Sequence, residues 1–598
     1  MNDPRTPLGV LLDPHDAERD RQLSRDHFGG YAAELLQHAG LDFRRLSRHS
    51  LLGTLPPIVL LPYPVRLARQ EAESLERHVK GGGAVIACGG VEGADELFGI
   101  VASRRYLDEA VLAWPENGFG LERGEMPVWG AQLAVPAGGV QAIGEVRSAA
   151  TPSLAADGYL GGTESGSGRA GEGVAAAAAA VSGVGATVRT SGAGAALYLA
   201  FDVPRSVVTM QQGVPVLGDA ASAPDGSAKL EDGIRKSDDG AVIDWRWREE
   251  SPEGPVFATP YADRLRELLV AAVVRCAEIT STPLALKWYW PDALPAVATL
   301  SFDTDSNEDA DGWEFMRVLE QLDVVGTWCV MFPGGYSRAL YEALRERNDE
   351  IALHYDALTS DLKGVPHCGW SWEDFLHQLD WLRSETGVER VVSQKNHVTR
   401  WEGLLELFRW VERAGITVDQ TKGPSKIGNL GFNFGTCHLW RPMEDLRDGN
   451  RCMDLFELPF LTHDMHTSQR RVELRRLLVE RVARHGGAAH FIFHPQRIHE
   501  EGMREALADV VNYARGRGLE WWTSERIARW EKARRRAKVG LAEADRSLRL
   551  DSAAAPRGLT VLLFGVKERF AGEGVERVQA FGSPAVRVVL PERNEAIR

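Results

Sequence analysis

The sequence predicts a multidomain α/β protein with an N-terminal parallel sheet, a β-rich insertion, a β/α barrel and a small C-terminal β module. Three observations predict this architecture. Apolar runs alternate with amphipathic helical patterns over the first hundred residues, and again, more regularly, between residues 294 and 540. Short β-type runs dominate the segments between and after these regions. At about 150 residues per domain, a chain of 598 residues has room for three or four domains.

The composition excludes several classes of protein. Lys and Arg number 69 against 84 Asp and Glu, and the net charge of −15 argues against nucleic acid or anionic membranes as partners. No run approaches the roughly 18 apolar residues of a membrane span, and the N-terminus lacks a secretion signal, so we expect a cytoplasmic location. The six cysteines form no CxxC pair, which is typical of reduced thiols.

Residues 1–104 carry the first alternating pattern. Buried strands are predicted at 7–13, 57–63 and 84–88, and amphipathic helices at 27–40 and 70–83. Strands that alternate with helices predict a parallel sheet covered by helices on both faces.

The run LERHVKGGGAVIACGG (75–90) resembles the flavodoxin-like, glutamine-amidotransferase-like domains that are often attached to carbohydrate enzymes. In that family, the nucleophilic Cys lies on a strained Gly-x-Cys-x-Gly elbow. Here Cys88 directly follows Ala87 at the end of a strand, so no elbow is present, and a small buried hydrophobic role is expected for it. The domain is therefore predicted to be non-catalytic.

Residues 105–250 predict a β-rich insertion, because runs such as AQLAVPA, GATVRTSG and AALYLAFDVP are typical of short strands. Within it, the Gly-, Asp- and Pro-rich stretch 213–243 predicts an extended connection. Residues 251–293 predict a helix at 261–280 that returns to the first domain, followed by a linker containing prolines.

Residues 294–540 show the most regular alternation of predicted strands and helices. Strands are predicted at 296–302, 324–330, 350–354, 390–394, 416–419, 455–460 and 488–493. Helical patterns fall between most of them, at 313–322, 371–382, 470–485 and 503–518. This repetition predicts a β/α barrel, in which strand ends carry the chemistry. Residues 541–598 predict a small β module.

Polar side chains follow the barrel strands at their carboxyl ends. The first strand runs into Ser-Phe-Asp303-Thr-Asp305, the third ends in His354, His397 follows the fourth, and His494 follows the last. Because the carboxyl ends of parallel strands meet at one edge of a barrel, these groups are expected to lie close together. Two carboxylates and three imidazoles can build a divalent metal site with an acid and a base beside it.

The motifs SFDTD, EIALH and FIFHP, in this order, resemble those of the NodB-homology or polysaccharide deacetylase group (carbohydrate esterase family 4) of distorted β/α barrels. The resemblance covers the block 294–540. It implies Asp303 as the general base, Asp305 and His354 as metal ligands, and His494 as the general acid.

The chain departs from the family pattern at one position. Four residues after His354, where the family has its second metal-binding histidine, stands Leu358. His397 is our candidate for a substitute ligand, because it follows the neighbouring strand. Arg400 is the candidate cation that pairs with Asp303 and keeps it ionised.

Each feature also has a simpler interpretation. The SFDTD motif could cap a helix, and a single histidine is more often structural than catalytic. His397 could equally orient another ligand or face the substrate. Asp464, after the strand 455–460, either fixes the tautomer of an active-site histidine or belongs to an ordinary loop.

Taken together, the sequence predicts a metal-dependent hydrolase that removes an acyl group, such as acetyl, from a carbohydrate or a related amide or ester. The expected cofactor is a divalent metal ion, with zinc favoured. The expected partner is a carbohydrate or acylated small molecule, and a homodimer stays open. Two alternatives remain: a non-catalytic carbohydrate-binding or assembly protein with a degenerate barrel, and a glycoside hydrolase on the same kind of barrel.

Overall fold

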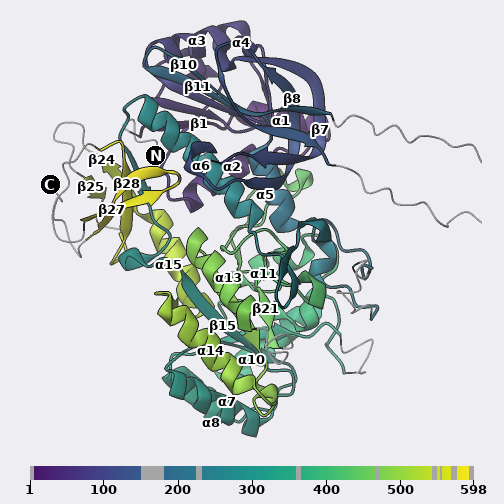
Figure 1. Cartoon of the computed structure of the whole chain (residues 1–598). Helices are drawn as coiled ribbons and strands as arrows, with labels where there is room; N and C mark the ends of the chain where they lie inside the picture. Colours follow the sequence, from purple (N-terminus) through teal and green to yellow (C-terminus); the bar gives the residue numbers. More distant parts are fainter. Residues whose placement is uncertain are drawn as a thin grey trace, which may run out of the picture.

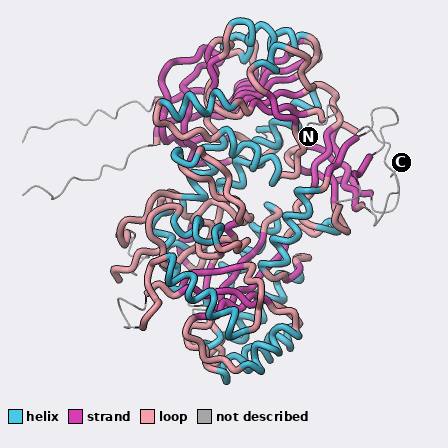
Figure 2. Tube along the Cα trace, turned by 180° about the vertical axis from the view of Figure 1, so that it is seen from behind, coloured by secondary structure: helices cyan, strands magenta, loops and turns pink. Residues whose placement is uncertain are grey.

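The computed structural model describes residues 6–116, 118–149, 181–221, 223, 232–358, 365–464, 472–541, 548–551, 555–566 and 575–590. Figure 1 shows three parts: an N-terminal sheet in purple and blue, a barrel-like body in teal and green, and a small yellow sheet beside them. Figure 2, seen from behind, shows the same three parts, with the C-terminal strands again at the side.

The N-terminal sheet joins parallel and antiparallel strands. Its parallel part has the order β2 (Arg44–Leu46), β1 (Leu8–Leu11), β3 (Ile58–Leu61), β5 (Ala84–Cys88) and β11 (Gly194–Leu199). Its antiparallel part continues with β10 (Ser182–Ser191), β9 (Gln141–Ser148), β7 (Ile100–Trp114) and β8 (Gly124–Pro136). The strands that the sequence predicts as a β-rich insertion thus extend the sheet of the first segment, because β11 pairs directly with β5.

Helices cover this sheet. They are α1 (Pro14–Gln22), α2 (Gly29–His38), α3 (Arg69–Lys80), α4 (Asp95–Phe98), α5 (Val203–Gln212) and α6 (Tyr261–Ile279). Helices α3 and α6 both contact β5 and β11, so the helix predicted at 261–280 does return to the first sheet. Most of α6 is buried, in keeping with its long apolar run.

The second large sheet is entirely parallel. Its order is β20 (Phe456–Glu457), β19 (Val418–Asp419), β18 (Ser393–Asn396), β17 (Glu350–Tyr355), β16 (Thr327–Met331), β15 (Val297–Asp303), β22 (Ala488–Phe493) and β21 (Thr462–His463), and β23 (Glu520–Trp521) also pairs with β15. Around it lie α7 (Asp309–Leu322), α8 (Arg338–Glu346), α10 (Trp372–Thr386), α11 (Glu406–Arg413), α13 (Val472–His485), α14 (Met503–Gly516) and α15 (Ser524–Arg536). The sheet has the mixed α/β, half-barrel form that the repeated βα pattern predicts.

Side chains alternate across this sheet, which separates an apolar outer face from a polar interior. On β15, Leu300 and Phe302 belong to the apolar core, and Phe302 stacks edge-on against Trp328 of β16. Ser301 and Asp303 point the other way and reach Lys395 of β18. The barrel interior therefore carries buried polar groups directly below the strand ends.

The C-terminal strands β26 (Thr560–Phe564), β28 (Ser583–Val589) and β27 (Val575–Ala580) form an antiparallel sheet with β14 (Leu284–Lys287). Strand β14 comes from the predicted linker, so that segment closes the edge of the small module. A separate hairpin joins β24 (Lys538–Leu541) and β25 (Leu548–Asp551).

The N-terminal segment and the barrel meet at a buried network of ion pairs. Arg535 of α15 binds Glu34 of α2 through two hydrogen bonds of 2.6 and 2.8 Å, and it also binds Glu531 at 2.6 Å. His38 of α2 contacts the same Glu531 at 2.9 Å. Within the part of the chain that is described, no helix is long and apolar enough to cross a membrane.

Candidate active site

The structure brings most of the predicted site residues together at the carboxyl edge of the barrel sheet. Asp303 is the last residue of β15, and Asp305 follows two residues later. His354 lies in β17, His397 directly follows β18, and His494 directly follows β22. These four strands lie within the run β18, β17, β16, β15 and β22 of the sheet.

Three imidazoles converge on the carboxylate of Asp305. The Nε2 atom of His354 lies 3.2 Å from Oδ1 of Asp305. The Nε2 atoms of His494 and His397 lie 3.5 and 3.9 Å from Oδ2. Burial alone would raise the pKa of Asp305, but the hydrogen bond from His354 and the nearby imidazoles outweigh burial and hold the pKa well below its usual range.

In His354 and His397, the Nδ1 atom has a partner that orients the ring. The Nδ1 atom of His354 lies 3.1 Å from the carbonyl oxygen of Lys395, and since a carbonyl only accepts, Nδ1 carries the proton. The Nδ1 atom of His397 lies 3.1 Å from a carboxylate oxygen of Asp356. Both contacts hold Nε2 on the side of Asp305, which is how metal-binding histidines are oriented. Nε2 of His354 donates to this carboxylate, and loss of that proton would free its lone pair for a ligand bond.

His494 has a different environment. Its Nδ1 atom lies 2.8 Å from Oδ1 of Asp464, and its backbone N–H donates to Oδ2 of the same carboxylate at 3.2 Å. Burial lowers the pKa of His494, but Asp464, followed by Asp305 and Asp303, outweighs burial and raises it to about 9. The imidazole is therefore a proton donor near neutral pH. Of the two interpretations of Asp464, this contact matches the one in which it fixes an active-site histidine.

Asp303 is 6% exposed and has a cation beside it, but that cation is not the predicted one. Nζ of Lys395 lies 3.1 Å from Oδ1 of Asp303 and also donates to Oγ of Ser301 at 2.5 Å. The guanidinium of Arg400 instead donates to Glu402 at 2.6 Å. The pairing predicted between Arg400 and Asp303 is therefore replaced by the pair of Lys395 and Asp303.

The reason lies in the backbone after β18. Lys395 is inside the strand and points into the barrel, whereas Arg400 follows a tight turn that carries it away from Asp303. The sequence signal for Lys395 is its place directly after the predicted strand 390–394 and two residues before His397; the observed strand, Ser393–Asn396, includes it.

A buried hydrogen-bonded chain supports Lys395. Oγ of Ser301 lies 2.7 Å from Nε2 of His490, and Nδ1 of His490 lies 3.2 Å from the carbonyl oxygen of Leu458. Because the carbonyl only accepts, Nδ1 of His490 carries its proton and Nε2 accepts from Ser301. Ser301 is then free to accept from Lys395, so the ammonium is fixed in place against Asp303.

The helix-capping interpretation of SFDTD does not describe this structure. Helix α7 begins at Asp309, and its N-cap residue, Glu308, makes no side-chain cap. Asn307 instead donates to the carbonyl oxygen of Met331 at 2.9 Å. The side chain of Asp305 faces imidazoles rather than the exposed amides of the helix.

The donor set of Asp305, His354 and His397 suits a divalent metal in its chemistry: one carboxylate and two imidazoles, each oriented through Nδ1 so that Nε2 lies on the side of Asp305. Leu358, four residues after His354, is buried. Its backbone N–H donates to Asp356 at 2.9 Å, and this is the carboxylate that orients His397. The three donor atoms are not all within 4.8 Å of one another, so they must draw together around an ion.

Among the described residues, one group has all its ligand atoms within 4.8 Å: Asp263, Cys437 and His438, between α6 and the barrel. The carboxylate of Asp263 is already satisfied there. It accepts from Thr436 at 2.7 Å and from the backbone N–H of Cys437 at 2.8 Å, and it pairs with Arg266 at 3.1 Å. A guanidinium on the same carboxylate repels a metal ion, so this group is an ion-paired junction.

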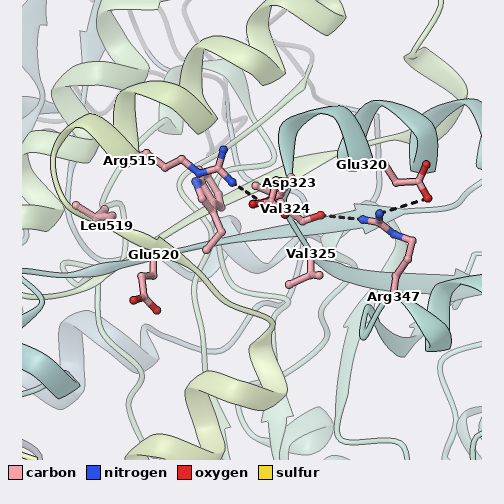
Figure 3. Close-up of a pocket in the computed structure, with 9 residues that line it drawn as sticks. Glu320, Asp323, Val324, Val325, Arg347, Arg515, Leu519 and Glu520 are labelled. Carbon is pink, nitrogen blue, oxygen red and sulfur yellow. Dashed lines mark hydrogen bonds and ion pairs between the residues drawn. The ribbon is translucent and has the colours of Figure 1, made fainter. Parts of the chain in front are cut away.

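A pocket of about 450 Å³ lies at the opposite, amino-terminal edge of the barrel (Figure 3). Arg515 donates to the carbonyl oxygens of Leu322 and Asp323, and Arg347 donates to that of Val324 at 2.8 Å. The carbonyls of Leu322 and Asp323 are the last residue and the C-cap of helix α7, where cations are favourable, and Val324 follows directly. The arginines of this pocket therefore have a structural role, and the pocket is far from the strand-end site.

Comparisons with known proteins give only distant similarities. No protein-family model matches the chain, and no curated protein matches it. A proposed polysaccharide deacetylase from Mycobacterium smegmatis shares 16% identity, with 41% of this chain and 92% of that chain covered and a TM-score of 0.32. A proposed polysaccharide deacetylase of O-antigen biosynthesis from Bordetella bronchiseptica shares 16% identity, with 40% and 86% covered and a TM-score of 0.26. A carbohydrate esterase family 4 pseudoenzyme from Bacillus anthracis shares 11% identity, with 40% and 66% covered and a TM-score of 0.25. At these values the similarities do not identify a reaction.

Proposed function

We propose that this protein is a metal-dependent hydrolase that removes an acyl group from a carbohydrate or a related amide or ester. The observation that carries the proposal is the convergence of three imidazoles on Asp305, with a second carboxylate, Asp303, at the end of the same strand. These groups are of the kinds that a metal-assisted hydrolysis needs: ligands, a base and an acid.

The residues that would hold the ion are Asp305, His354 and His397. A bound divalent ion, with Zn²⁺ favoured by the imidazole ligands, polarises an acyl carbonyl and lowers the pKa of a water molecule. The surroundings favour a cation, because Asp303 and Asp305 outweigh burial and raise the pKa of His354. Asp356 and the carbonyl oxygen of Lys395 keep the two ligand rings oriented.

The chain's own residues divide the proton transfers between them. Asp303, held by Lys395, accepts the proton of the attacking water. His494, protonated through its contact with Asp464, donates a proton to the leaving amine or alcohol. A carboxylate base and an imidazolium acid on the same site permit direct attack by water without a covalent enzyme intermediate.

The remaining segments are proposed as scaffold. The parallel strand order of the first sheet and the burial of Cys88 support a flavodoxin-like, non-catalytic N-terminal domain. Burial raises the pKa of the Cys88 thiol well above its usual value, which suppresses the nucleophilic thiolate. The proposed segments are 1–104, 105–250, 251–293, 294–540 and 541–598, of which the first two share one sheet and the third lends β14 to the last. The net charge of −15 favours neutral or amino sugars over polyanions, and six free cysteines support a reducing, cytoplasmic location.

The test measures acetate release from acetylated amino sugars, together with metal content. Asp303→Asn should abolish turnover while the bound metal is retained, because only the base is lost. Asp305→Ala should lose both turnover and the bound metal, because a proposed ligand is removed. Asp323→Asn, at the opposite edge of the barrel, is the matched control and should change neither turnover nor metal content. Unchanged turnover in Asp303→Asn would remove this residue as the base.

The same assay separates the alternatives. A wild-type protein that binds acetylated sugars but never releases acetate would be the binding or assembly protein with a degenerate barrel. New reducing ends in place of acetate would indicate a glycoside hydrolase. A well-ordered wild type that takes up no divalent ion would contradict the metalloenzyme proposal.

A further inference from the structure

The backbone directly after His397 is strained. Val398 has φ 47° and ψ 26°, and Thr399 has φ 54°, so two consecutive β-branched residues occupy the left-handed region. In this region Cβ is crowded against the backbone, and β-branched residues are outliers there. Such strain persists only where the surrounding structure enforces it.

The strained turn sets where His397 lies. It reverses the chain immediately after β18, and Arg400 N–H donates back to the carbonyl oxygen of His397 at 3.0 Å. The side chain of Asn396, fully buried, donates to the carbonyl oxygen of Arg400 at 2.8 Å. The turn therefore leaves His397 at the end of the strand, with Nε2 on the side of Asp305.

A segment from outside the barrel holds the far side of this turn. We call the described residues 214–221 and 232–240, which follow α5, the strap. Val216 and Gly403 exchange two backbone hydrogen bonds of 2.9 and 3.0 Å. Trp401 N–H donates to the carbonyl oxygen of Arg235 at 3.1 Å. The guanidinium of Arg235 donates to Glu402 at 2.8 Å.

The strap is in turn fixed to the loop after β19. Oδ2 of Asp238 accepts three hydrogen bonds, from the backbone of Ser425 at 2.9 Å and Lys426 at 3.0 Å, and from Asn429 at 2.9 Å. Nζ of Lys426, whose side chain is 1% exposed, pairs with Asp239 at 2.7 Å and with Asp219 of the strap at 2.8 Å. The strap thus joins the loops that follow two neighbouring barrel strands.

We propose that the strap, supplied by the N-terminal segment, is a positioning element that holds the strained turn 397–403 and thereby aims His397 at the metal site. This rests on the proposed function in one respect, the role of His397 as a ligand. Asp238 and Arg235 are then positioning residues, which touch neither metal nor substrate. The N-terminal segment is more than scaffold, because it completes the geometry of the barrel's site.

The test is a titration of the full-length apoprotein with Co²⁺, in which the d–d absorption reports both affinity and ligand geometry. Asp238→Ala removes three hydrogen bonds from the strap and should weaken Co²⁺ binding by roughly 10- to 100-fold, as loss of an outer contact to a ligand does. Asp238→Asn keeps one acceptor oxygen and should recover part of the affinity. Glu412→Ala is the control, because that carboxylate also accepts three hydrogen bonds, from Arg451 and Asp454, but lies outside the strap.

A rescue distinguishes positioning from general destabilisation. Glycine adopts the left-handed region without strain, so Val398→Gly combined with Asp238→Ala should restore Co²⁺ affinity toward that of the wild type. A structural loss of the strap would not be repaired in this way. If Asp238→Ala does not fold, Arg235→Ala, which removes only the pair with Glu402, replaces it in the same series.

His397→Ala separates the two proposals. If His397→Ala leaves Co²⁺ affinity unchanged, the ligand role fails, and the proposed metal site with it. If His397→Ala weakens binding but Asp238→Ala does not, the ligand role stands and the strap proposal is overturned. If both the ligand role of His397 and the strap proposal are correct, Asp238→Ala should cause no further loss of Co²⁺ affinity in the His397→Ala background. The reason is that the strap acts through the side chain of His397.

Discussion

Replacement of Asp464 by Asn tests how His494 is kept protonated. The substitution removes the carboxylate charge 2.8 Å from Nδ1 of His494 but keeps an amide oxygen that accepts the same hydrogen bond. Asp464 is the largest contribution that raises the pKa of His494 to about 9, whereas burial lowers it. In Asp464→Asn we therefore expect the pKa of His494 to fall to its ordinary value or below.

The magnitude follows from the pKa. The pKa is raised from 6.5 to about 9, and at 1.36 kcal/mol per unit this is roughly 3 kcal/mol in favour of the imidazolium. Since the pKa is raised in the folded state, this stabilisation is fully present below pH 6.5 and is lost as the pH rises through about 9. In Asp464→Asn this pH-dependent loss of stability should be absent. The basic limb of the variant's pH–rate profile should move to lower pH by about 2.5 units or more.

The assay is an NMR titration of ¹³C-labelled histidine, assigned with His494→Gln, alongside acetate release as a function of pH. Asp356→Asn is the matched control, because Asp356 supports His397 instead and should leave the pKa of His494 unchanged. If His494 still titrates near 9 in Asp464→Asn, the reasoning is wrong, and another group holds the proton.

Three further outcomes are expected. Lys395→Met removes the cation beside Asp303 and should lower turnover by roughly 100-fold with metal content unchanged; equal turnover would show that Asp303 needs no cation. Arg535→Met leaves buried carboxylates without a partner and should lower the free energy of unfolding by roughly 3–5 kcal/mol; denaturation with urea measures this, and a loss below about 1 kcal/mol would contradict it. Burial raises the pKa of Asp202 to about 6, so the folded state loses stability as the pH rises from about 4 to 6. Asp202→Asn keeps the N-cap and should be more stable at pH 7 by up to roughly 3 kcal/mol, but not at pH 4; equal shifts at both values would refute this.

The barrel strands were predictable because burial leaves a strong local signal. Runs such as AVATLSF and AAHFIF lie in the described strands β15 and β22, and polar residues directly after them lie at the site. Since all strands of this sheet are parallel, their carboxyl ends meet, and strand ends alone were enough to bring Asp303, His354 and His494 together.

The partners of these residues were not predictable in the same way. Lys395 is fully buried, and its ammonium binds Ser301 and Asp303 of the distant strand β15, which no local sequence pattern records. Arg400 does not pair with Asp303, because the left-handed turn at Val398 and Thr399, which is contrary to local preference, precedes it and its guanidinium pairs with Glu402. The strands after residue 100 extend the first sheet through the pairing of β11 with β5, about a hundred residues apart in the chain, and hydrophobic periodicity does not encode such pairings.

Two features that cost free energy, the left-handed turn after His397 and the buried ammonium of Lys395, lie beside the strand-end site. Their location helps to choose between an enzyme and a binding protein with a degenerate barrel. Left-handed β-branched residues cost about 1–3 kcal/mol each, and burying the ammonium of Lys395 also costs free energy. These features lie beside the strand-end site, whereas the arginines at the opposite edge simply cap a helix. A protein that only binds sugar needs neither a fixed ammonium against a buried carboxylate nor an imidazole held as its cation. Proton transfer uses both of these features, which favours the proposed hydrolase over a protein that only binds sugar.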